Sequence, residues 1–240
     1  MIMEGYTLGH YDKHQLTIMP TTQCNMRCVY CLTNARENES IRRIDEVFAQ
    51  AIISDYLSSC DHPWIRFYGA GEATIEIDMI KRLIDYADHI SSAPIYYELQ
   101  TNAFFSLDTA EYIGQKFNVV YISMDGSPNI NDRQRLTKCG KPTSESIVRN
   151  IKLLNKMTTL GIRATITVCN VNKQREMVDY FASLGIKFLF SKPVLPSVSS
   201  HKNAEYVVPL MTYAENYVDA YRYAKDKGMF YGNIYIVNIL

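Results

Sequence analysis

Three cysteines are crowded into one short string of this 240-residue sequence. Cys24, Cys28 and Cys31 occur as Cys-Asn-Met-Arg-Cys-Val-Tyr-Cys, and a loop can fold such spacings around a metal centre bound by thiolates. A structural zinc site uses four ligands, whereas three cysteines on a four-iron cluster leave one iron open to another molecule. The spacing therefore favours an iron–sulfur cluster. The alternatives are zinc with a remote fourth ligand, Cys60 or His62, or three buried thiols.

A run of small residues with one carboxylate follows the second strand expected in the chain. Gly69, Ala70 and Gly71 precede Glu72 in the string Gly-Ala-Gly-Glu-Ala-Thr. A turn of small residues lets backbone carbonyls approach a ligand closely, and a glutamate there can accept hydrogen bonds from an ammonium group or orient the turn. Taken alone, such a turn is also typical of an ordinary strand-to-helix loop.

Two further clusters of polar side chains follow the third and fourth expected strands. Thr101 and Asn102 come after the third strand, and Ser123, Asp125 and Arg135 come at or after the end of the fourth. Such side chains can hydrogen-bond hydroxyl groups, and an arginine can pair with a carboxylate through two N–H donors. Isolated strings of this kind are also typical of turns and helix caps.

The elements that would position these residues alternate along the chain. Short β-rich runs predict strands at residues 16–19, 64–68, 95–99, 119–123, 164–168 and 187–190. Segments of helical period predict helices at residues 44–58, 77–90, 109–116, 145–160 and 175–184, with Gly161 and Gly185 as C-terminal stops. This alternation predicts an α/β fold with parallel strands, either curled into a partial (β/α)6 barrel, which we favour, or doubly wound. In both cases chemistry gathers at the carboxyl ends of the strands.

The end of the chain departs from this regular pattern. Residues 192–203 contain two prolines and several serines, which indicates a loop, and we expect a helix at 208–227 and a strand at 231–240 after it. We therefore expect a core at residues 1–191 and an extension of loop, helix and strand at residues 192–240. The extension either leads to a further C-terminal domain or completes a minimal protein.

The composition argues against several classes of function. Lys plus Arg and Asp plus Glu both number 25, so no basic excess neutralises a phosphate backbone, and we expect no nucleic-acid partner. No apolar stretch approaches the ~18 residues of a membrane span, and the first residues lack the apolar core of a signal peptide. With 47% hydrophobic and 21% charged residues, the sequence predicts a globular cytoplasmic protein without a membrane partner.

The cysteine string resembles the signature of the radical S-adenosylmethionine (SAM) superfamily. In that signature, three and then two residues separate the cysteines, and an aromatic residue, here Tyr30, precedes the last of them. The resemblance implies that Cys24, Cys28 and Cys31 hold a [4Fe-4S] cluster whose open iron chelates the amine and carboxylate of SAM. It also implies that Tyr30 lies near the adenine.

The turn at residues 69–72 is similar to the Gly-Gly-Glu-Pro element that binds the methionyl amine in this superfamily. By that similarity, Gly69, Ala70, Gly71 and Glu72 contribute to SAM binding. Ala70 replaces a glycine and Ala73 replaces the proline. We therefore expect a turn that avoids positive φ at Ala70 and is less rigid at Ala73.

The residues at and after the end of the fourth expected strand indicate which branch of the superfamily the sequence resembles. The end of this strand, Ser-Met-Asp-Gly, is followed by Asn-Asp-Arg-Gln-Arg, which resembles peptide- and protein-modifying enzymes that often carry a cysteine-rich SPASM or twitch domain. The resemblance implies that Ser123, Asp125 and Arg135 contact or frame SAM, with Thr101, Asn102 and Asn170 as polar neighbours. The auxiliary-cluster domain would need further cysteines, and none occurs after residue 200.

The resemblance also implies an activity. An external electron donor such as a flavodoxin or ferredoxin reduces the cluster, SAM is cleaved to a 5′-deoxyadenosyl radical, and the radical abstracts hydrogen from a peptide or protein substrate. Cys139, in the loop after Arg135, is a candidate hydrogen donor to the substrate radical, as in peptide epimerases of the superfamily. The alternatives are a glycyl-radical enzyme activase, an enzyme of small-molecule cofactor biosynthesis, or a non-catalytic iron–sulfur electron-transfer protein.

Overall fold

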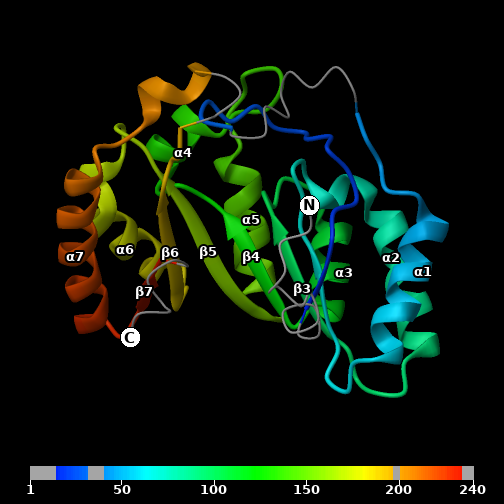
Figure 1. Cartoon of the computed structure of the whole chain (residues 1–240). Coiled ribbons are helices and arrows are strands. Elements are labelled where there is room, and N and C mark those ends of the chain that lie inside the picture. Colours follow the sequence, from blue (N-terminus) through cyan, green and yellow to red (C-terminus); the bar gives the residue numbers. More distant parts are fainter. Residues whose placement is uncertain (1–14, 32–40, 197–200, 234–240) are drawn as a thin grey trace, which may run out of the picture.

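The computed structural model describes residues 15–31, 41–196 and 201–233. Over these ranges the chain forms one sheet of seven parallel strands in sequence order (Figure 1). The strands are β1 (Leu16–Ile18), β2 (Trp64–Phe67), β3 (Tyr96–Thr101), β4 (Val119–Ser123), β5 (Thr159–Ile166), β6 (Phe188–Pro193) and β7 (Phe230–Gly232). The α-helices are α1 (Glu46–Ser58), α2 (Ile77–Ile90), α3 (Leu107–Lys116), α4 (Pro128–Gln134), α5 (Ser144–Leu154), α6 (Gln174–Ser183) and α7 (Leu210–Asp226).

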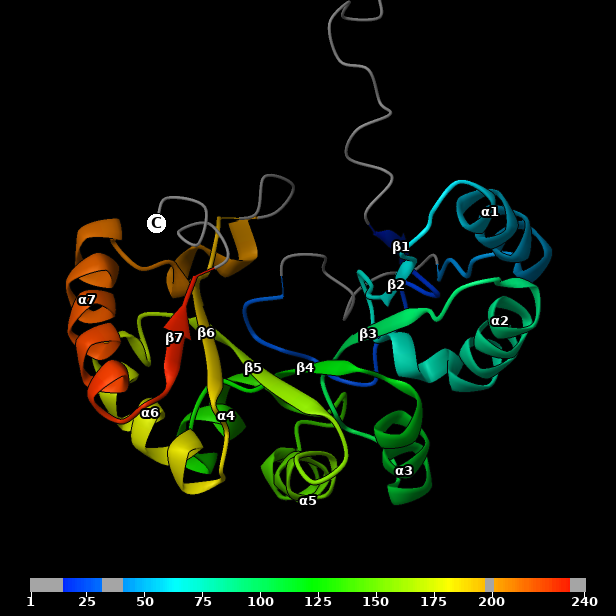
Figure 2. The ribbon, with the colours of Figure 1, turned by 90° about the horizontal axis from the view of Figure 1, so that it is seen from below.

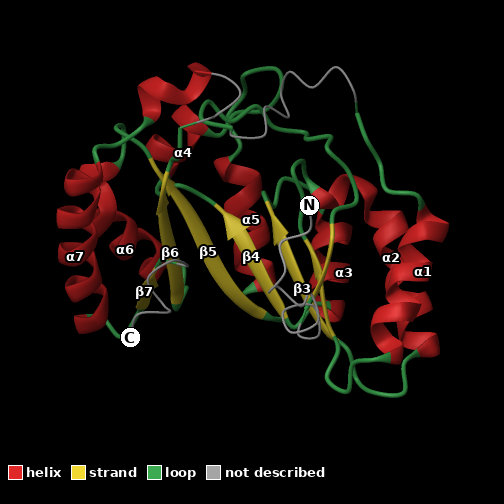
Figure 3. Cartoon of the chain, in the orientation of Figure 1, coloured by secondary structure: helices red, strands yellow, loops and turns green. Residues whose placement is uncertain are grey.

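The sheet is curved, and helices cover its convex face. Figure 2 shows the strands as an arc from β1 to β7, with the longer helices on the outside of the arc. Figure 3, in the orientation of Figure 1, shows the helices and the sheet in separate colours. The strand order places β1 and β7 at opposite edges of the described sheet, so the arc is not closed. The expected α/β class with parallel strands in a partial barrel is confirmed.

The hydrophobic core lies between the sheet and the helices because the strands place apolar residues at every second position. In β5, Leu160, Ile162 and Ile166 are buried, whereas Arg163 and Thr165 between them line a cavity on the concave side. Successive side chains of a strand point to opposite faces, so one alternating pattern supplies both the core and the concave surface. The concave face is therefore where polar groups of several strands can meet.

The expectation for the fifth strand was wrong in its bounds and in the role of Gly161. The strand spans Thr159–Ile166 rather than residues 164–168, and the helix expected at 145–160 ends at Leu154. Gly161 lies inside the strand, where a Cβ would come within 2.7 Å of the Tyr121 ring. The glycine therefore serves a close side-chain approach instead of ending a helix. Gly185, with a φ of 77°, follows α6 as expected.

The remaining differences concern the ends of elements. The loop expected at residues 192–203 begins later, because β6 continues to Pro193, and the short helix α4 was not expected. Of the strand expected at 231–240, the structure shows β7, and residues 234–240 lie outside the described residues. The division of the chain at residue 191 stays a prediction. Among the described residues, no helix is long and apolar enough to cross a membrane.

Candidate functional site

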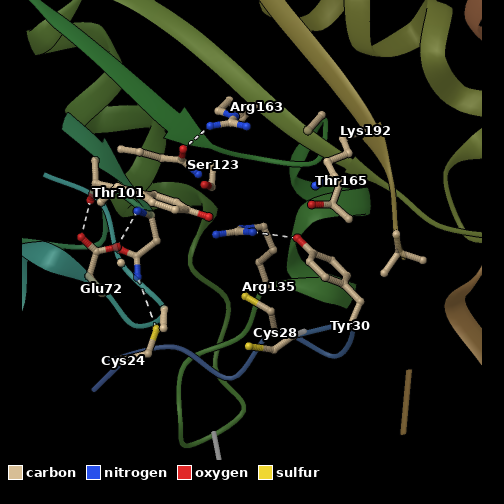
Figure 4. Close-up of a pocket in the computed structure, with 18 of the residues that line it drawn as sticks. Cys24, Cys28, Tyr30, Glu72, Thr101, Ser123, Arg135, Arg163, Thr165 and Lys192 are labelled. Atoms are coloured by element: carbon tan, nitrogen blue, oxygen red, sulfur yellow. Dashed lines mark hydrogen bonds between the residues drawn. The ribbon is translucent and has the colours of Figure 1, made fainter. Parts of the chain in front are cut away.

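A cavity of about 280 Å³ opens at the carboxyl ends of the strands, on the concave side of the sheet (Figure 4). Most of the residues predicted from the sequence line it. These are Cys24, Cys28, Tyr30, Cys31, Gly69, Ala70, Gly71, Glu72, Thr101, Asn102, Ser123 and Arg135. They come from the loop after β1, from the ends of β2, β3 and β4 and, for Arg135, from the end of α4. A parallel sheet thus brings together motifs that are far apart in the sequence.

The cysteine loop is attached to the segment after α4 by backbone hydrogen bonds. Arg27 N donates to Leu136 O at 2.7 Å, and Val29 N donates to Gln134 O at 2.9 Å. Met26, between the first two cysteines, is almost fully buried and anchors the loop. These contacts fix the backbone on which the three thiols are carried.

Burial raises the pKa of Cys24, and it raises the pKa of Cys28 to about 12. Both thiols therefore favour the protonated form in the free protein, and binding of iron as thiolate must release protons. Arg135 opposes the rise at Cys28 because its positive charge favours the thiolate.

The structure bears on the zinc site that the sequence left open. Among the described residues, no three cysteine, histidine or carboxylate side chains are placed to hold one metal ion. Cys60 and His62 precede β2, at the end of the sheet away from the cysteine loop, so the structure does not bring either residue to the three cysteines.

The small-residue turn is shaped by its contact with the cysteine loop. Glu72 N donates to Gln23 O at 2.8 Å, and a Cβ on Gly71 would lie 2.1 Å from that same carbonyl oxygen. Glycine is required at this position because the two backbones touch. Ala103 is the one non-glycine residue with positive φ in the described chain, so the expectation that Ala70 avoids positive φ is confirmed.

Glu72 is enclosed by hydrogen-bond donors and is 3% exposed. Its Oε1 accepts from Thr74 N at 3.2 Å, Thr74 Oγ1 at 2.7 Å and Thr101 Oγ1 at 2.6 Å. Its Oε2 accepts from Asn102 N at 2.7 Å. Of the two roles predicted for this carboxylate, the geometry supports orientation of the turn, because four protein donors already satisfy it.

A second buried network joins the cysteine loop to the segment after β4. Tyr30 Oη donates to Asp125 Oδ2 at 2.6 Å. Arg135 Nη1 donates to Tyr30 Oη at 2.7 Å, a bond drawn in Figure 4. Thr165 N donates to Asp125 Oδ1 at 3.0 Å, and Asn170 Nδ2 donates to the backbone oxygen of Asp125 at 3.2 Å. The network holds Tyr30 and Arg135 at the wall of the cavity.

The charges of this network support one another. Burial raises the pKa of Asp125, and Arg135 opposes that rise. Burial also raises the pKa of Tyr30 well above its usual value. Burial alone would lower the pKa of Arg135, but its neighbours Cys28, Tyr30 and Asp125 outweigh this, so its pKa lies well above the ordinary value. The guanidinium is therefore cationic, and its Nε is buried without a hydrogen-bond partner among the described residues.

Three predicted residues stand apart from the cavity lining. Asp125 and Asn170 are fully buried behind it, where they support Tyr30, Arg135 and the end of β5. Cys139 is exposed in the turn that precedes α5 and does not line the cavity. Its role as a hydrogen donor stays a prediction.

Sequence reasoning missed the wall formed by β5 and β6. The cavity is lined there by Arg163, Thr165, Phe190 and Lys192, together with Tyr68, directly after β2, and Gln100 on β3. The sequence does contain a pattern that indicates this role for Arg163, because an arginine alternates with apolar residues in Leu-Gly-Ile-Arg-Ala-Thr-Ile. The strand expected at residues 164–168 excluded Arg163, so the prediction did not place its side chain on the concave face.

Comparison with known proteins decides the family. The model of the radical SAM superfamily matches residues 18–181, most of the chain. The chain belongs to the radical SAM superfamily. Membership implies SAM and an iron–sulfur cluster as cofactors, and the three cysteines at one cavity fit that chemistry.

Sequence relatives of this radical SAM protein include maturation enzymes. An uncharacterized protein of Methanocaldococcus jannaschii is 31% identical over 192 residues, covering 79% of this chain and 65% of the relative. The cysteine-type anaerobic sulfatase-maturating enzyme of Clostridium novyi is 26% identical over 195 residues, covering 77% of this chain and 52% of the enzyme. The chain thus spans between half and two thirds of these relatives.

Solved radical SAM structures share the fold. The native anSMEcpe structure with bound AdoMet superposes with a TM-score of 0.82 at 22% identity, covering 93% of this chain and 64% of that one. Streptococcus suis SuiB bound to its precursor peptide SuiA superposes with a TM-score of 0.71 at 15% identity, covering 91% and 48%. At these identities the likeness establishes the fold of the radical SAM chain.

Proposed function

We propose that this chain binds a [4Fe-4S] cluster through Cys24, Cys28 and Cys31 and binds SAM in the adjoining cavity. One observation carries the proposal: the cysteine loop and polar side chains from the ends of three further strands line a single cavity. The bound cluster and SAM would supply a 5′-deoxyadenosyl radical, which abstracts hydrogen from a substrate. We further propose a peptide or protein substrate, and reduction by an external flavodoxin or ferredoxin in the cytoplasm.

The chain's own residues divide the work of binding. Glu72 orients the turn at residues 69–72, whose small residues leave backbone groups open to the methionyl amine. Arg135 presents a cation to the methionyl carboxylate, and Ser123 presents a hydroxyl to the ribose. Tyr30, held between Asp125 and Arg135, forms the wall beside the adenine. Enclosure by the sheet keeps water from the reacting centre.

Two features support a peptide or protein substrate. Sulfatase-maturating enzymes are among the sequence relatives, and SuiB, which shares the fold, was solved with a precursor peptide. The Ser-Met-Asp-Gly string that contains Ser123 and Asp125 also resembles the peptide-modifying branch of the superfamily.

The experiment is reductive SAM cleavage under anaerobic conditions. We would reconstitute the cluster, add SAM and dithionite, and measure 5′-deoxyadenosine by mass spectrometry. We expect production by the wild type and by Cys60→Ala, a matched control before β2, and none by Cys28→Ala. An intact cluster without SAM binding would overturn the proposal in favour of an electron-transfer protein.

A further inference from the structure

Positively charged side chains gather on the concave face of the sheet, on strands β2 and β5. Arg66 on β2 donates a hydrogen bond from Nη2 to Oε1 of Gln100 on β3, at 3.0 Å. Arg163 on β5 donates from Nη1 to the same oxygen atom. Two guanidinium groups thus converge on one neutral amide oxygen. Lys192 on β6 lines the same cavity as Arg163.

No carboxylate of the described residues forms an ion pair with Arg163, although the negative charge of Glu98 favours the charged guanidinium. Glu98 lies on the same face, but its Oε1 is 2.9 Å from Arg66 Nε and its Oε2 accepts from Gln15 Nε2 at 3.3 Å. Glu72 lines the cavity too, yet its four donors are threonine and backbone groups of the rim. Arg163 therefore has no ion pair with a carboxylate of the described residues.

This state is costly for a half-buried guanidinium. A buried charge is stabilised only when it is paired and hydrogen-bonded, and a second cation close by raises the cost. Burial, and next the charge of Arg66, lower the pKa of Arg163, which reflects the same repulsion. The guanidinium remains charged because its ordinary pKa is so high. A negative group brought by a ligand would remove the penalty.

The position of Arg163 points to the substrate instead of SAM. Arg163 pairs in register with Ser123 on β4 and Phe190 on β6, so it belongs to the strand wall and not to the cysteine loop. Figure 4 shows Arg163 and Lys192 on the side of the drawn pocket away from Cys24 and Cys28. The methionyl carboxylate of SAM belongs at the cysteine side, where Arg135 already provides a cation.

We propose that Arg163, with Lys192 beside it, binds a carboxylate of the substrate, so that the enzyme selects peptides carrying an acidic group near the reacting carbon. A carboxylate matches the two parallel N–H donors of a guanidinium, and the planar fork fixes its orientation. The group is the side chain of Asp or Glu or the free C-terminus of a peptide. This inference rests on the proposed function, because it names the substrate class of the same site.

Affinity selection from synthetic peptides tests the inference. Reconstituted, SAM-bound protein is incubated anaerobically with two pools of random decapeptides, one amidated at the C-terminus and one with free carboxylates, and retained peptides are identified by mass spectrometry. From the amidated pool we expect Asp and Glu to be enriched about tenfold over Asn and Gln, as one charge-assisted pair predicts. Retention of peptides from the free-carboxylate pool, with no Asp or Glu enrichment and little retention from the amidated pool, would assign the group to a C-terminus.

Three variants make the selection decisive. Arg163→Met should abolish the acidic enrichment, and Arg163→Lys should keep part of it, since lysine retains charge but loses the fork. Arg222→Met, an exposed position on α7, should match the wild type. If Arg163→Met does not fold, as judged by circular dichroism, the reduction in Arg163→Lys decides.

The inference is overturned by a wild type that shows neither acidic enrichment in the amidated pool nor preferential retention of the free-carboxylate pool. An Arg163→Met variant that keeps the wild-type preference also overturns it. Retention of no peptide at all overturns it as well. Failure of the proposed function is a separate result, because it would show as absent 5′-deoxyadenosine and absent SAM binding in the wild type before any peptide is added.

Discussion

Two regions of the cavity differ in how their charges are balanced. The rim contains Glu72, Tyr30 and Arg135, and the strand wall contains Arg66, Gln100 and Arg163. At the rim, Glu72 accepts four hydrogen bonds and Asp125 is joined to Arg135 through Tyr30. On the wall, Arg66 and Arg163 share the amide oxygen of Gln100. The rim carries closed networks, whereas the wall carries an excess of cations.

This difference separates two tasks of one cavity. A cofactor of constant structure is best held by groups already locked in place, because no reorganisation is then needed on binding. A substrate site can leave charge uncompensated, since the matching substrate supplies the partner and a mismatched one does not. The free energy of unfolding and ligand binding should therefore respond differently to changes in the two regions.

The largest effect is expected from Gly71→Ala, which disrupts the rim. The added Cβ would lie 2.1 Å from the carbonyl oxygen of Gln23, so either the turn or the cysteine loop must move. We expect loss of cluster retention, measured by iron content and visible absorbance. Gly69→Ala is the matched control, because its Cβ would meet Thr21 O at 3.3 Å and needs only a small shift. Equal cluster retention in both variants would contradict the close approach.

Glu72→Gln should produce the next largest effect. An amide NH₂ group must replace one acceptor oxygen and then faces Thr74 and Thr101 hydroxyls or the Asn102 N–H. A buried donor left facing donors costs about 1–3 kcal/mol. Urea unfolding at neutral pH measures the loss. An unchanged free energy of unfolding would contradict the donor set around this carboxylate.

Tyr30→Phe should give a moderate effect at the rim. The change removes the hydroxyl that donates to Asp125 and accepts from Arg135, while the ring stays in place. A hydrogen bond to a charged group contributes roughly 1.5–3 kcal/mol, and some of this is recovered when Arg135 approaches Asp125 directly. Isothermal titration with SAM and urea unfolding should both register the loss. Unchanged values in both would show that the bridge is not needed.

The smallest effect concerns the pH dependence of the wall. Burial raises the pKa of Glu98, although Arg66 and Arg163 oppose the rise. The Glu98 carboxyl therefore stays protonated to a higher pH in the folded protein than in the unfolded chain. The free energy of unfolding then falls as the pH rises from the unfolded pKa to the folded pKa, and it is constant above the folded pKa. Glu98→Gln should flatten that slope in urea unfolding measured between about pH 4.5 and 7. Asp125, whose pKa burial also raises, retains a slope of the same sign.

Local patterns in the sequence determined the fold class and most of the rim. The spacing of Cys24, Cys28 and Cys31, the small residues before Glu72 and the polar ends of β3 and β4 are all contiguous strings, so their chemistry is legible without coordinates. Alternation of strand and helix patterns predicted a parallel sheet, and a parallel sheet gathers the ends of its strands at one edge.

Only the tertiary structure decided how the cavity is completed. Glu72 meets Thr101 and Asn102 across two strands, and Arg163 meets Gln100 across β4, contacts that depend on register and curvature. Gly161 illustrates what a local sequence pattern cannot decide. A glycine after a helical pattern is typical of a helix C-terminus, but Gly161 lies inside β5, where it leaves room for the ring of Tyr121 on the neighbouring strand. Sequence specifies which groups are present, and the register of distant strands decides which charges remain for a ligand to neutralise.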